Sequence, residues 1–79
     1  MTLSHDRLSE MLRSMPEDDR RTAKWVVGKD VPPLLFQLPG MGGLYYAIPG
    51  EDGSVGLLYG RPMFVDETIY DPTAVVLHR

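Results

Sequence analysis

Residues that could carry out acid–base or metal chemistry are few and far apart in this 79-residue sequence. The two histidines, His5 and His78, stand near opposite ends of the chain, and there is no cysteine to act as a nucleophile or thiolate ligand. An active site requires a nucleophile, an acid or base, and groups that hold them together. The sequence offers no such set, so we expect no catalytic residues, no metal site, no cofactor and no enzyme activity.

The acidic run Glu17-Asp18-Asp19 is the closest approach to a set of metal-binding oxygens. Neighbouring side chains on a connector point in different directions, and no histidine accompanies the run. Because Arg20 and Arg21 follow directly, the local charge nearly cancels. We therefore interpret this segment as solvated surface charge.

The glycines at positions 50, 53 and 56 are spaced three apart, as glycines in a phosphate-cradling loop can be. Such a loop must lead into a helix, whereas the Leu57-Leu58-Tyr59 that follows has the composition of a strand. Glu51 and Asp52 would also repel a phosphate group. The segment is better explained as a mobile hairpin tip.

The aromatic rings of Tyr45, Tyr46, Tyr59 and Phe64 could stack on nucleic-acid bases. Such binding needs a basic surface, but the formal net charge is −3 and the basic residues are dispersed. We therefore expect these rings in the core or in protein interfaces, and no specific nucleic-acid binding. No apolar run approaches the roughly 20 residues that cross a bilayer, so we expect a soluble intracellular protein with no membrane partner.

The chain is long enough for one small domain spanning 1–79. Its central element is a hairpin, which must position the glycines and aromatic residues discussed above. Residues 44–48 and 55–59 are rich in aromatic and branched residues and flank a polar turn segment. A third apolar run, residues 63–65, follows Gly60-Arg61-Pro62. The proline predicts a kink there, after which the chain re-enters the sheet in a new direction.

A helix is predicted at the start of the chain. Ser4 is a suitable N-cap, and Pro16 disfavours helix at Met15, so the helix should end there. Its apolar stripe falls at helical spacing and consists of Leu8, Met11, Leu12 and Met15.

Three further elements are predicted around the hairpin. Residues 22–27 have the pattern of a strand with Trp25 on its core face. Asp30 can cap a second helix over residues 31–38, where prolines in the first turn cost little. Residues 74–77 form a last short strand.

Together these elements predict an α+β domain with two short helices packed on a mostly antiparallel sheet of four to five short strands and a long hairpin loop. A chain of this length buries only about 60% of the surface that it exposes when unfolded, so a partner chain is the most economical source of further stability. We expect either a truncated domain or one whose last strand borders another chain. The candidate core residues are Leu8, Met11, Leu12, Trp25, Val27, Leu35, Phe64 and Val65.

Several motifs follow one another in a set order along nearly the whole chain. They are residues 12–16, Arg20-Arg21, Ala23 with Trp25-Val26-Val27, residues 31–38, Gly43-Leu44-Tyr45, residues 58–63, Asp66 with Glu67, and residues 71–77. This order resembles the axial domain of the major capsid protein of tailed bacteriophages, which has the Hong Kong-type capsid fold. Family members share a leucine-rich helix, Trp-Val, Gly-x-Tyr and Leu-x-Gly-x-Pro before a hydrophobic strand.

The chain also departs from that family. Gly28 stands where an asparagine is usual, and Pro32-Pro33 interrupt a helix that is normally rich in alanine and leucine. The N-terminal arm, the extended loop and the peripheral domain with its spine helix, which family members use to build a shell, have no counterpart in it. The resemblance thus implies a domain that contacts other subunits, and not one that closes a capsid by itself.

The resemblance implies two alternative functions. The first is structural: a phage or prophage capsid-like protein, fragment or standalone relic, that forms a ring-type homo-oligomer at the capsomer centre, in the virion or in the bacterial host cytoplasm. The second is a regulator that binds full-length phage capsid protein and blocks or redirects head assembly. A small enzyme or nucleic-acid binder is a third alternative, from a different class. The interface candidates are Tyr45, Glu51, Asp52, Ser54, Tyr59 and Arg61.

Overall fold

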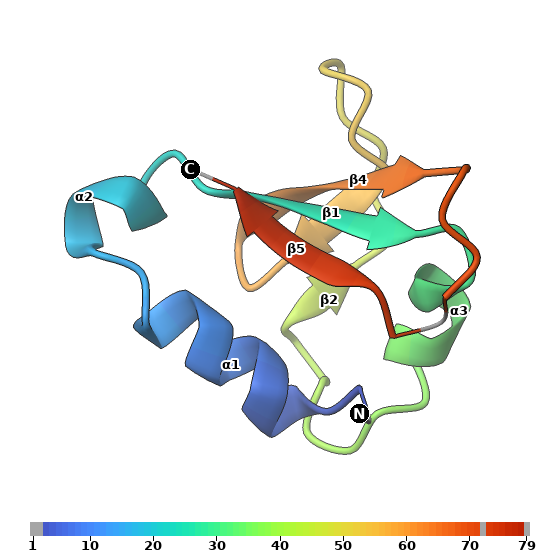
Figure 1. Cartoon of the computed structure of the whole chain (residues 1–79), viewed down its shortest axis with the longest axis horizontal. Coiled ribbons are helices and arrows are strands. Elements are labelled where there is room, and N and C mark those ends of the chain that lie inside the picture. Colours follow the sequence, from blue (N-terminus) through green and yellow to red (C-terminus); the bar gives the residue numbers. More distant parts are fainter. Residues whose placement is uncertain (1–2, 72, 79) are drawn as a thin grey trace.

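Five short strands form one mixed sheet, and two of the helices pack on one of its faces (Figure 1). The structure is a computed structural model, and it describes residues 3–71 and 73–78. Within these residues the elements are, in chain order, α1 His5–Arg13, α2 Glu17–Arg20, β1 Lys24–Gly28, α3 Val31–Leu35, β2 Tyr45–Tyr46, β3 Gly56–Leu58, β4 Arg61–Asp66 and β5 Val75–His78. The predicted α+β class with a mostly antiparallel sheet is confirmed.

The strands lie in the order β2-β3-β4-β1-β5. The β1–β4 pair is parallel, and the other neighbouring pairs are antiparallel. Trp25 of β1 is paired with Met63 of β4 and with Leu77 of β5, so these three side chains share one face, which we call the core face. The next register position pairs Val26 with Phe64 and Val76 on the opposite face, which we call the open face.

Helix α1 begins at its predicted cap and ends two residues earlier than predicted. The Ser4 hydroxyl oxygen accepts a hydrogen bond of 3.1 Å from the backbone N–H of Arg7, which satisfies one of the free amides of the first turn. At the other end, both the backbone N–H and the hydroxyl of Ser14 donate to the carbonyl oxygen of Glu10. Ser14 therefore caps the helix before Met15 is reached.

The other helices also differ from the prediction. The charged connector contains α2, with three acidic residues in its first turn and Arg20 in its last, an arrangement that the helix dipole favours. Helix α3 ends at Leu35 instead of residue 38, and Asp30 makes no side-chain capping hydrogen bond. The following turn is held by a bond from the N–H of Gln37 to the carbonyl oxygen of Leu34.

The predicted kink at Pro62 is wrong, because a tight hairpin joins β3 to β4. Leu58 is paired with Arg61, so Tyr59 and Gly60 alone make the turn. Both have positive φ, 53° for Tyr59 and 76° for Gly60, as a type I′ turn requires. Pro62 lies within β4 opposite Leu57 and continues the strand without a change of direction.

The strands of the predicted β2–β3 hairpin are shorter than expected. Pairing covers two residues of β2 and three of β3, while residues 47–53 form the exposed loop between them. The polar, glycine-rich tip therefore extends further into both arms than the apolar pattern suggested. Strand β1 is displaced by two residues at its start and includes Gly28, whose N–H donates to the carbonyl oxygen of Ala74.

The core lies between the core face of the sheet and the helices. Of the predicted core residues, Leu8, Trp25, Val27 and Leu35 are fully buried, and Met11, Leu12 and Val65 pack around them. Phe64 needs correction: it is only partly buried and lies on the open face, because Met63 takes the inward position in β4. Leu3, Val31, Met41, Leu58 and Val75 complete the buried cluster.

Candidate interaction surfaces

The tip of the β2–β3 hairpin is the most prominent projection of the molecule (Figure 1). Glu51 and Asp52 lie there and are exposed. The turn is closed by a bond from the N–H of Gly50 to the carbonyl oxygen of Ser54, and by one of 3.0 Å from the N–H of Ser54 to Oδ1 of Asp52. Hydrogen bonds from the side chain and backbone of Ser54 lower the pKa of Asp52. The tip thus presents a defined turn with two carboxylates.

Ser54 itself is not available for contacts with another molecule, in contrast to its prediction as an interface residue. Only 6% of its surface is exposed. The reason is its place at the base of the turn, where its N–H and carbonyl oxygen both close the loop. Ser54 therefore shapes the tip and does not form part of its outer surface.

Three further interface candidates make contacts within the chain. The Tyr45 ring lies 4.8 Å from the Phe36 ring between centroids, and Arg61 donates from Nε to the carbonyl oxygen of Ala23 at 2.8 Å. The Tyr59 ring stacks on His5, whose Nδ1 is 2.6 Å from the tyrosine hydroxyl. Burial raises the pKa of Tyr45 and of Tyr59, and the nearby charge of Asp6 adds to the effect at Tyr59. These side chains hold the hairpin and α1 to the sheet.

The open face carries an apolar stripe that sequence reasoning did not identify as a site. Its members come from all five strands, and they are Val26, Tyr46, Leu57, Phe64 and Val76. Tyr46 is 48% exposed and Val76 47%. The buried side chains of α1 and α3 belong to the cluster on the core face, so neither helix shields the stripe.

A signal for this face is present in the sequence. A strand with one wet face alternates apolar and polar residues, whereas a strand covered on both faces is apolar throughout. Three consecutive apolar residues occur in each of three adjacent strands: residues 25–27, 63–65 and 75–77. The register then places one residue of each triplet side by side on the open face. The pattern is that of a sheet with both faces covered.

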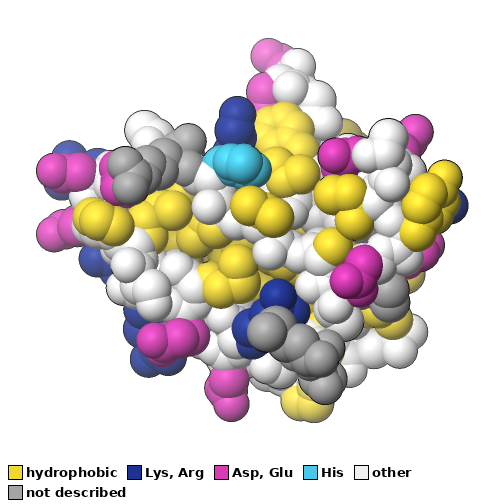
Figure 2. All heavy atoms as spheres, viewed as in Figure 1, with side chains coloured by type: hydrophobic (Ala, Val, Ile, Leu, Met, Phe, Trp, Pro, Cys, Tyr) yellow, Lys and Arg dark blue, Asp and Glu magenta, His cyan; other side chains and the backbone are white. Residues whose placement is uncertain are grey.

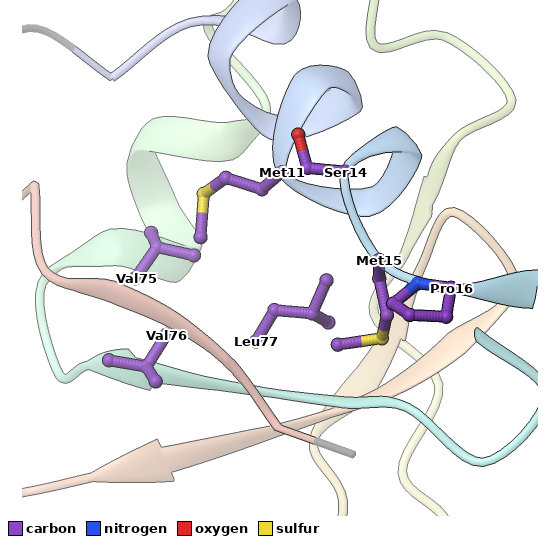
Figure 3. Close-up of a pocket in the computed structure, with 7 residues that line it drawn as sticks. All are labelled: Met11, Ser14, Met15, Pro16, Val75, Val76 and Leu77. Atoms are coloured by element: carbon purple, nitrogen blue, oxygen red, sulfur yellow. The ribbon is translucent and has the colours of Figure 1, made fainter. Parts of the chain in front are cut away.

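A groove lies beside the outer edge of the sheet, between the end of α1 and β5. It is an open groove of about 480 Å³, lined on one side by Met11, Ser14, Met15 and Pro16 and on the other by Val75, Val76 and Leu77. In Figure 3, Met15 and Leu77 point toward each other across it, and Met11 points toward Val75. Figure 2 shows hydrophobic side chains gathered in this part of the surface.

The residues that could take part in acid–base or metal chemistry do not lie together. His5 packs on Tyr59, while His78 is paired with Lys24 at the far end of β1 and β5. Within residues 3–71 and 73–78, no three His, Cys, Asp or Glu side chains are placed to hold a metal ion. In the same part of the chain, no helix has the length and apolar character to cross a membrane.

The chain matches no protein-family model, no curated protein and no solved structure.

Proposed function

We propose that this chain is a structural assembly domain of the phage-capsid type, which contacts neighbouring copies of itself through the open face of its sheet. The observation that carries the proposal is the alignment of Val26, Phe64 and Val76 on that face, beyond the reach of the core-face helices. The order of the sequence motifs, which resembles that of the capsid axial domain, supports the same conclusion. The site of action would be the virion or the cytoplasm of the bacterial host.

The energetics favour burial of this face. Full burial of an exposed valine, leucine or phenylalanine side chain is worth about 1.5–3 kcal/mol, and the stripe contains several that are partly exposed. Association of two proteins costs about 4–15 kcal/mol in lost freedom and ordering. The gain from one partly exposed patch is of the same size as that cost, so contacts with a second neighbour, as in a ring, would add to the stability of the assembly.

The hairpin tip fits this role as a second contact. It projects from the body of the domain and presents Glu51 and Asp52, which can meet basic residues of a neighbour (Figure 1). Exposed charges of this kind contribute little affinity but fix the orientation of the partner. In a ring the apolar stripe would supply the binding energy, and the tip would set the register.

Sedimentation velocity over a range of protein concentrations tests the proposal. We expect the wild-type chain to form closed oligomers, and Tyr46→Ser to shift them toward monomer. Tyr70→Ser is the matched control, because Tyr70 is 69% exposed but stands outside the stripe. A wild-type chain that stays monomeric up to about 1 mM, where only very weak association would escape detection, would overturn self-assembly. A monomer that binds intact phage capsid subunits would favour the regulatory function instead.

A further inference from the structure

The outer edge of β5 presents backbone groups that can accept another strand. Strand β5 is last in the sheet order, so β1 pairs with it on one side only. The N–H of Gly28 donates to the carbonyl oxygen of Ala74, and hydrogen-bonding residues alternate along an antiparallel pair. Ala74, Val76 and His78 therefore bond toward β1, while the N–H and C=O groups of Val75 and Leu77 point outward. Such an edge is a template for strand addition.

The groove lies along this same edge and has the chemistry to hold side chains of an added strand. A strand paired with Val75 and Leu77 would direct every second side chain toward the core-face side, where Met11, Met15 and Leu77 line the groove. Methionine side chains adapt to partners of different shape. The hydroxyl of Ser14, on the lining, already donates to Glu10, so the groove favours apolar side chains.

The surroundings of the groove select a single extended segment over a second copy of this domain. Helix α1 runs alongside β5 and bounds the groove on its far side (Figures 1 and 3). A second copy that offered its own β5 would bring its own α1 into the same space. One strand without a flanking helix meets no such obstacle.

Strand pairing gives the segment a direction. The antiparallel arrangement is the more stable one, and a strand antiparallel to β5 would begin beside His78 and end beside Val75. Charge adds no direction, because Arg20 and Arg21 follow the acidic residues of α2 at one end, and Arg7 interacts with Asp71 at the other.

We propose that the groove between α1 and β5 binds an extended, alternately apolar segment of another polypeptide, which pairs with Val75 and Leu77 as a sixth strand antiparallel to β5. This is binding by strand addition, in which main-chain hydrogen bonds give affinity and side-chain pockets give selectivity. The site shares Val76 with the stripe proposed for self-assembly, but it pairs through the outward backbone groups of Val75 and Leu77, which the stripe does not use. Shifts at Val75 and Leu77 that are lost on N-methylation of the peptide therefore distinguish strand addition from contact with the open face.

Titration of the isotope-labelled chain with a blocked peptide, Lys-Thr-Val-Thr-Val-Thr-Val-Glu, tests the inference by NMR. We expect saturable shifts of the Val75 and Leu77 amides and slower hydrogen exchange at both. A twin peptide, N-methylated at the amides that would pair, should bind at least about tenfold more weakly. Met15→Asp should weaken the unmodified peptide by a similar factor, and Met15→Leu should retain binding. All four titrations use a chain shown to be folded by its amide spectrum.

Three outcomes would overturn the proposal. The first is the absence of any shift at Val75 and Leu77 with about 1 mM peptide. The second is equal binding of the N-methylated twin, since that would exclude backbone pairing. The third is a set of shifts centred on Val26 and Phe64, which would place the peptide on the open face.

Discussion

The indole nitrogen of Trp25 donates a buried hydrogen bond of 2.8 Å to the backbone oxygen of Leu58. The bond joins β1 to β3, two strands that are not neighbours, because β4 lies between them in the sheet. Trp25 thus spans the core face and fixes the two hairpins formed by β2, β3 and β4 to β1. The Tyr59 ring, 6.1 Å from the indole between centroids, extends the contact to the turn after β3.

Replacement of Trp25 should separate packing from hydrogen bonding. Trp25→Ala should lower the free energy of unfolding by about 3–5 kcal/mol through the cavity that it leaves. Trp25→Phe keeps most of the ring but leaves the Leu58 oxygen without its donor, at a cost of about 1–3 kcal/mol. Urea denaturation measures both, with Tyr70→Ala at an exposed position as the control, expected within about 0.5 kcal/mol of wild type. An unchanged midpoint for Trp25→Phe would show that the hydrogen bond contributes nothing.

A methyl group at Gly28 should not be tolerated. A Cβ atom there would stand 2.9 Å from the backbone oxygen of Asp71 and 3.2 Å from Ile69. Gly28→Ala should therefore cost about 1–3 kcal/mol through overpacking. Gly42→Ala is the matched control: its Cβ meets nothing within 4 Å, so it should be neutral or stabilise by about 0.4–1 kcal/mol. Thermal unfolding compares the two, and equal melting temperatures would show that the loop of Asp71 moves away without cost.

Stability should fall at alkaline pH, partly through Tyr59. Burial, with the charge of Asp6, raises the pKa of Tyr59 in the folded chain. The folded state therefore keeps its proton when the unfolded state releases it, above about pH 10. The stabilisation is complete below that pH and is lost as the pH rises through the folded pKa. Tyr59→Phe should flatten the fall measured by denaturation at pH 9–11, with Tyr70→Phe as reference; identical slopes would contradict the assignment.

The loop before β5 should weaken at low pH. The backbone N–H and hydroxyl of Thr73 each donate to Oδ1 of Asp71 at 2.8 Å, and these bonds lower the pKa of that carboxyl. The resulting stabilisation is present above the unfolded pKa of about 3.9 and is lost as the pH falls through the folded value. Asp71→Asn should make the Thr73 amide exchange faster at neutral pH and remove its acid dependence, whereas Asp18→Asn on exposed α2 should do neither.

Local patterns in the sequence predicted much of the fold. The Ser4 cap and the apolar stripe of α1, the alternation around Trp25 and the hairpin about residues 49–53 depend on neighbours in the chain, so they are visible without coordinates. The turn at Tyr59-Gly60 was missed because its positive φ at a tyrosine is uncommon. The proline two residues later gave a stronger but misleading signal of a break.

Of the candidate sites, the exposed tip with Glu51 and Asp52 was predictable from its turn composition alone. The other sites depended on contacts between distant segments. The strand order and the register decided that Phe64 faces outward beside Val26 and Val76, and that β5 is an edge with a groove. The sequence by itself determined which residues are apolar and where helices, strands and turns form, because those preferences are properties of short segments. Only the tertiary structure decided which apolar side chains remain uncovered, because burial depends on contacts between residues far apart in the chain.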